Sequence, residues 1–96
     1  MEEFKLKYKL VKIFKVIKDR DWEIRKIGAT RKEKVCTHCG AKIPIGNISI
    51  DFTKRTTTNR DTIYDVRYAC TRTCAVGIAI NLEIDTNEMV RNIMNM

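Results

Sequence analysis

The chain has 96 residues, 44% hydrophobic and 32% charged, and 19 Lys and Arg against 12 Asp and Glu give a net charge of +7. This length suits one domain with a modest core and excludes a two-domain enzyme with a cleft between its lobes. The single histidine excludes catalysis by a histidine pair. Because the longest uncharged run, Thr73 to Leu82, is far shorter than a bilayer span, and no signal-peptide pattern is present, we expect a cytoplasmic protein without membrane contact and with reduced cysteines.

The positive charge is concentrated before the C-terminal part of the chain. Residues 1–35 carry a net charge of +6, residues 36–74 carry +3 and residues 75–96 carry −2. A basic domain favours an anionic partner, most often nucleic acid. The alternative is that the lysines serve only solubility or thermal stability. Charge alone leaves both interpretations open.

The N-terminal third is predicted to be rich in strands. Apolar and lysine residues alternate from Phe4 to Leu10, which predicts a strand with one charged face. Residues 10–18 fit either a short amphipathic helix or a strand, and their β-branched content favours the strand. A turn at 19–21, a second strand over Trp22–Ile27 and a polar linker over 28–34 follow. The lysines of the first charged face are Lys5, Lys7 and Lys9.

The middle of the chain is predicted to form a β-hairpin. Residues Ile48–Phe52 alternate as a strand, and Ile63–Ala69 is a second strand candidate. Between them, Thr53–Asp61 is predicted to be a polar hairpin loop. The basic residues of this loop are Lys54, Arg55 and Arg60.

Two helices are predicted to follow the hairpin. Thr71 is placed to cap a helix from about Arg72 to Glu83, with Val76, Ile80 and Glu83 or Ile84 at helical spacing. Asp85 to Glu88 resembles a capping box that starts a last helix. That helix carries an apolar stripe, which we expect to pack against the protein's own sheet, although methionine-rich stripes also serve adaptable interfaces. The stripe comprises Met89, Val90, Ile93 and Met94.

The four cysteines carry the strongest chemical signal. Cys36 and Cys39 are spaced C-x2-C, and Cys70 and Cys74 are spaced C-x3-C. Residues four apart share one helix face, so Cys70 can end a strand while Cys74 projects from the first helical turn. Four thiolates bind Zn²⁺ tetrahedrally and leave no open position for water, which predicts one structural zinc and argues against metal-assisted hydrolysis. His38, between two ligands, is predicted to be a solvated residue and not a ligand.

The arrangement resembles treble-clef zinc fingers. Residues Cys36–Gly46 and Tyr68–Ala75 are similar to the C-x-x-C-G…I-x-x-G…Y-C-S-x-x-C-A signature of small TRASH-type, MYM-type and ribosomal-protein modules. The similarity covers roughly residues 36–84, and the chain departs from the signature at Ala69 and in a longer hairpin loop. The resemblance implies a structural zinc and a role in binding nucleic acid or protein, while members of the fold group differ widely in function.

The expected organisation is therefore an α+β treble-clef module with additions at both ends. We expect a basic β-rich extension over 1–34, the zinc module over 35–84 and a C-terminal helix over 85–96. The predicted zinc ligands are Cys36, Cys39, Cys70 and Cys74. The predicted nucleic-acid contacts are Lys5, Lys7, Lys9, Lys54, Arg55 and Arg60.

Two functions fit these features, and neither is an enzyme's, because no nucleophile–base pair, phosphate loop or supported carboxylate dyad is present. The first is a regulator or accessory factor that binds DNA or RNA. The alternative is an adaptor or inhibitor that docks on a larger protein complex through the last helix.

Overall fold

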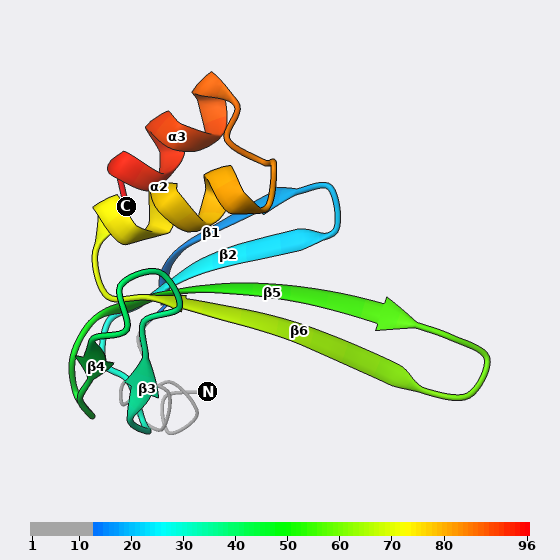
Figure 1. Cartoon of the computed structure of the whole chain (residues 1–96), viewed down its shortest axis with the longest axis horizontal. Helices are drawn as coiled ribbons and strands as arrows, with labels where there is room; N and C mark the ends of the chain where they lie inside the picture. The colour runs from blue at the N-terminus through cyan, green and yellow to red at the C-terminus, as the bar shows by residue number, and fades with distance from the viewer. Residues whose placement is uncertain (1–12) are drawn as a thin grey trace, which may run out of the picture.

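The computed structural model describes residues 13–96, and the strand predicted for Phe4–Leu10 lies outside this range. The architecture is α+β, with two antiparallel sheets and two C-terminal helices (Figure 1). The larger sheet has the strand order β1-β2-β5-β6, and the smaller one pairs β3 with β4. The strands are β1 (Ile13–Asp19), β2 (Trp22–Ile27), β3 (Lys34–Val35), β4 (Lys42–Ile43), β5 (Ser49–Thr57) and β6 (Thr62–Ala69), and the helices are α2 (Arg72–Asn81) and α3 (Asn87–Met94).

The first two described strands agree with the sequence-based prediction. Strand β1 confirms the extended conformation over the described part of residues 10–18, and β2 has the predicted bounds. The two strands pair from Asp19 opposite Trp22, so the intervening turn contains only Arg20 and Asp21. Arg20 has a φ of 53°, the left-handed conformation that this tight reversal requires.

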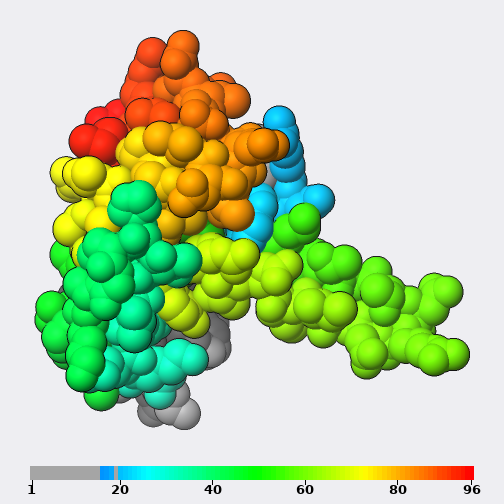
Figure 2. Space-filling model, in the orientation of Figure 1, coloured from blue at the N-terminus to red at the C-terminus, as the bar shows by residue number. Residues whose placement is uncertain are grey.

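The hairpin of β5 and β6 is longer than predicted. The predicted loop over Thr53–Asp61 is wrong for its first half, because β5 continues to Thr57 and pairs with β6 as far as Thr62. Thr57, β-branched like its two threonine neighbours in sequence, suits an extended backbone, and the ladder of hydrogen bonds satisfies polar groups that a loop would leave to water. The end of β5, the turn after it and the start of β6 project from the body of the protein as a narrow arm (Figures 1 and 2).

Helix α2 begins where predicted but ends earlier. Thr71 is the N-cap, and the helix ends at Asn81 instead of Glu83. Glu83 adopts a φ of 60°, and the amide of Ile84 donates to the carbonyl of Ala79 at 3.0 Å, an arrangement that closes the helix and turns Ile84 into the core. Of the apolar residues at helical spacing, Ile84 is buried, whereas Ile80 is 53% exposed. The buried residues of α2 are Cys74, Ala75, Ile78 and Ala79.

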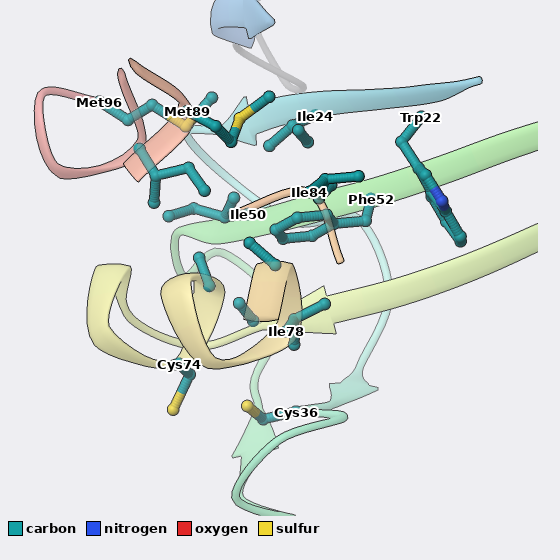
Figure 3. Close-up of a cluster of buried hydrophobic side chains, with 14 of the residues drawn as sticks. Trp22, Ile24, Cys36, Ile50, Phe52, Cys74, Ile78, Ile84, Met89 and Met96 are labelled. Atoms are coloured by element: carbon teal, nitrogen blue, oxygen red, sulfur yellow. The ribbon is translucent and has the colours of Figure 1, made fainter. Parts of the chain in front are cut away.

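The core lies between the inner face of the larger sheet, meaning the face turned toward α2 and α3, and the two helices (Figures 1 and 3). Phe52 and Ile24 are completely buried at its centre. The small side chains of Ala75 and Ala79 let α2 approach the sheet closely. Helix α3 adds Met89 and Ile93 from its apolar stripe, while Met94 stays exposed.

Candidate metal centre

The structure brings all four cysteines together. Cys36 and Cys39 lie in the turn after β3, and Cys70 and Cys74 lie between the end of β6 and the first turn of α2. The four sulfur atoms all lie within 4.8 Å of one another. The Sγ atoms of Cys39 and Cys70 are 3.5 Å apart, and those of Cys70 and Cys74 are 3.8 Å apart. Thiolates arranged tetrahedrally around Zn²⁺ lie about 3.8 Å apart, so this cluster can hold a metal ion of that kind.

The turn that carries the first cysteine pair is held by backbone hydrogen bonds. The amide of Gly40 donates to the carbonyl of Cys36 at 2.9 Å, and the amide of Cys36 donates to the carbonyl of Ala41 at 2.8 Å. Gly40 has a φ of 79°, a conformation that side chains with a Cβ rarely adopt. The glycine therefore lets the chain reverse tightly enough to direct both sulfurs to one point.

Thr37 joins the first cysteine pair to the strand that leads to the second. The amide of Thr37 donates to the carbonyl of Tyr68 at 2.8 Å, and the amide of Tyr68 donates to Oγ1 of Thr37 at 3.0 Å. Tyr68 is two residues before Cys70, so these bonds set the distance between the two pairs. Nothing in the sequence indicates this role of Thr37, because a threonine between two cysteines does not reveal a hydrogen-bond partner 31 residues away.

The second pair is positioned by the start of α2. The side chain of Thr71 accepts a hydrogen bond from the amide of Cys74 at 3.1 Å. This cap fixes the first helical turn and orients the buried Cys74 toward the other sulfurs. The positive end of the helix dipole lies at the same place and favours thiolates.

The four cysteines are free, and their surroundings shift the pKa values of Cys36 and Cys70 in opposite directions. Burial raises the pKa of Cys36, but backbone hydrogen bonds with Cys39, Cys70 and His38 outweigh that effect and lower the pKa to about 6. Burial, followed by hydrogen bonds with the sulfurs of Cys39 and Cys36, raises the pKa of Cys70 to about 12. A metal ion that binds at neutral pH therefore displaces the proton of Cys70. The apparent metal affinity increases with pH as long as this thiol is protonated in the metal-free protein.

His38 packs against α2, although its side chain is exposed. A Cβ atom added to Gly77 would lie 2.5 Å from Cε1 of the imidazole and 2.7 Å from Nδ1. Glycine inside a helix costs about 1 kcal/mol relative to alanine. The ring therefore occupies the space that a side chain at position 77 would take, and any residue with a Cβ atom there has to displace it.

This contact predicts coupling between the two residues. Gly77→Ala in the wild-type background is expected to gain no stability, because the new methyl group displaces the imidazole of His38 and offsets the better helix propensity. In the His38→Ala background the same change is expected to stabilise the protein by about 1 kcal/mol. Urea unfolding of the wild type, both single variants and the double variant measures the difference, and an equal gain in both backgrounds would contradict the packing role.

A charged pair lies between the cysteine turn and the larger sheet. Lys34 Nζ is 2.6 Å from Asp51 Oδ2, and the two side chains are only 9% and 15% exposed. Ser49 donates to the other carboxylate oxygen at 2.8 Å, and the ammonium lies 4.8 Å from the centre of the Tyr68 ring. The pair therefore links β3, which precedes the first cysteine, to both strands of the long hairpin.

The predicted nucleic-acid contacts of the hairpin are separated by the structure. Lys54 lies beside Trp22, with its Nζ 6.0 Å from the ring centre, at the base of the arm. Arg55 is the next residue of the same strand and projects from the opposite face of the sheet. Arg60 is exposed in the turn at the tip. Lys5, Lys7 and Lys9 lie outside the described residues.

Among the described residues, no helix has both the length and the apolar character needed to cross a membrane. None of the protein-family models, curated proteins and solved structures that were compared with the chain matches it.

Proposed function

We propose that the protein is a small regulator or accessory factor that binds nucleic acid and holds one structural zinc ion. The four sulfur donors support zinc, because their spacing fits tetrahedral thiolate coordination. Four protein ligands fill such a coordination sphere, which supports a structural ion and a binding function without catalysis. The order of cysteine turn, hairpin and capped helix supports a module of the TRASH or MYM type.

The observation that carries nucleic-acid binding is the projecting arm, which presents two exposed arginines. Arg55 and Arg60 are exposed, and neither forms an ion pair within residues 13–96. The arm extends away from the body of the protein, so both guanidinium groups can reach a phosphate backbone (Figure 2). The tip between them is built from threonine and asparagine, which can donate hydrogen bonds to phosphates without reading bases.

A salt titration tests this proposal. Binding through about five phosphates is expected to give a log–log dependence of affinity on salt with a slope of roughly −4 to −5 on duplex DNA. Arg55→Ala combined with Arg60→Ala is expected to flatten that slope by about two, because two phosphate contacts are lost. Fluorescence anisotropy with labelled oligonucleotides across a salt series measures both values.

A matched control distinguishes the arm from total charge. Arg31 and Arg91 are also exposed, and Arg91 lies on α3, away from the arm. Replacing both with alanine removes the same charge and is expected to leave the slope within about one of the wild type. Equal effects of the two double variants would contradict a role for the arm, and absence of binding at low salt would favour the adaptor function.

The adaptor alternative rests on a different observation. Ile63 and Tyr64 are 52% and 60% exposed on the arm, as a protein-docking hairpin requires. Met89 and Ile93 of the last helix are buried in the protein's own core, which leaves mainly Met94 of that stripe for a partner. Recovery of a protein partner that survives nuclease treatment supports this alternative.

A further inference from the structure

The face of the larger sheet opposite the helices, called here the outer face, has a depression at the base of the arm. Its volume is about 380 Å³. The register places Arg55 directly opposite Tyr64, and Thr53 opposite Glu23 on the other side. The described helices both lie on the inner face, so neither covers the depression (Figure 1). The depression is lined by Asp21, Glu23, Arg25, Thr53, Arg55 and Tyr64.

Tyr64 offers an exposed aromatic ring on a paired strand. It is 60% exposed although it lies inside β6 and not at a loop tip. Its backbone is paired with Arg55 of β5, so its ring can accept a flat group without the ordering of a loop. Nucleobases stack on such aromatic residues, and the interaction tolerates any base because every base has a π face.

The charges around the ring are arranged for a nucleotide. Arg55 is the cross-strand neighbour of Tyr64 and has no ion pair among the described residues. The guanidinium of Arg25 is already paired with Glu23. The carboxylates of Asp21 and Glu23 line the depression and repel phosphate, so the phosphate backbone of a nucleic acid is favoured at the end of the depression where Arg55 lies. The carboxylates can accept hydrogen bonds from amino groups on the edge of a base.

We infer that the outer face binds single-stranded nucleic acid, with a base stacked on Tyr64 and a phosphate at Arg55; this inference rests on the proposed function and names its substrate class. The requirement for a free base face selects single strands over duplexes, whose bases are stacked on one another. DNA and RNA offer the same stacking and phosphate chemistry, so both are included in the test.

Strand alternation supplies matched controls at adjacent positions. Lys54 and Ile63 are the immediate neighbours of Arg55 and Tyr64 in sequence and project from the inner side of the same hairpin. Lys54 lines a separate depression beside Trp22 on the helical side. If the binding surface lies on the outer face, Arg55→Ala and Tyr64→Ala weaken binding, whereas Lys54→Ala and Ile63→Ala do not. Lys54→Ala removes the same charge as Arg55→Ala, and Ile63→Ala removes a large apolar side chain as Tyr64→Ala does.

The experiment uses the full chain and labelled strands of about 12 nucleotides, as DNA, RNA, a DNA duplex and an abasic strand with the same phosphates. Tyr64→Ala is expected to weaken binding of the single strands about 10-fold or more and to leave binding of the abasic strand unchanged. Arg55→Ala is expected to weaken binding of all strands several-fold, and Tyr64→Trp is expected to retain the affinity for normal single strands.

The outcomes separate this inference from the proposed function. If single strands, duplex and abasic strand bind equally, or if Ile63→Ala weakens binding as much as Tyr64→Ala, the outer-face inference is overturned while nucleic-acid binding stands. If no strand of any kind binds at low salt, the proposed function itself fails. If DNA binds and RNA does not, or the reverse, the inference holds with one nucleic acid as its ligand.

Discussion

In the zinc-bound protein proposed above, removal of the metal or replacement of Cys74 with serine is expected to abolish cooperative folding around the cysteine cluster. Structural zinc contributes about 10–16 kcal/mol of apparent folding free energy at neutral pH, which exceeds the total stability of most small domains. Cys36 and Cys74 are buried members of the hydrophobic core, so the loss extends from the cluster into the packing of α2 on the sheet. Circular dichroism during titration with a chelator, and thermal unfolding of Cys74→Ser, measure the effect.

Elemental analysis supplies the companion measurement. Protein purified without added metal is expected to contain about one equivalent of zinc. Thr73→Ser, an exposed change in the same helical turn as Cys74, is the matched control and is expected to leave metal content and unfolding unchanged. A folded protein that contains almost no metal would refute the structural role, and one equivalent of iron would replace zinc as the bound metal.

The second large effect is expected at the buried ion pair. Asp51→Ala leaves the ammonium of Lys34 nearly buried, and among the described residues it keeps the Ser49 hydroxyl at 3.4 Å and the face of the Tyr68 ring as neighbours. An unpaired buried charge is costly, and we expect a loss of about 3 kcal/mol in the free energy of unfolding. Urea unfolding of the metal-loaded protein measures it, because the pair lies beside the cysteine turn and metal occupancy must be the same in every variant.

Two further variants test the physical reason for that loss. Replacing both partners, as Lys34→Met with Asp51→Leu, is expected to recover most of the stability, because no charge is then left without a partner. Glu23→Gln breaks the more exposed pair with Arg25 and is expected to cost less than about 1 kcal/mol. A loss below about 1 kcal/mol for Asp51→Ala would show that water or other groups solvate Lys34. The ion pair would then make no large contribution to the free energy of unfolding.

Local sequence signals predicted the elements whose determinants lie close together in the chain. The segment Trp22–Ile27, which follows the predicted turn at 19–21, forms β2 with the predicted bounds. The hydroxyl of Thr71 predicted the start of α2, since capping involves residues only three apart. Glycine after the C-x2-C pair and the C-x3-C spacing at a helix start predicted that four sulfurs converge, because two tight turns suffice to direct each pair.

Other features depended on contacts between segments that are distant in sequence. The polar residues of Thr53–Thr57 looked like a loop, but pairing with Thr62–Val66 satisfies their backbone and extends the hairpin into an arm. The buried face of α2 was decided by packing on the sheet, which selected Ala75 over Ile80.

By itself, the sequence determined the four cysteines that could hold a metal ion, the α+β class, the bounds of β2 and the start of α2, because these follow from local spacing, turn residues and capping. Only the tertiary structure decided the tether of Thr37 to Tyr68, the pairing of Lys34 with Asp51, and the separation of adjacent basic residues onto opposite faces. The first two join segments that are distant in sequence, and the third follows from the extension of β5 into residues that looked like a loop, so all three depend on partners that no short segment contains.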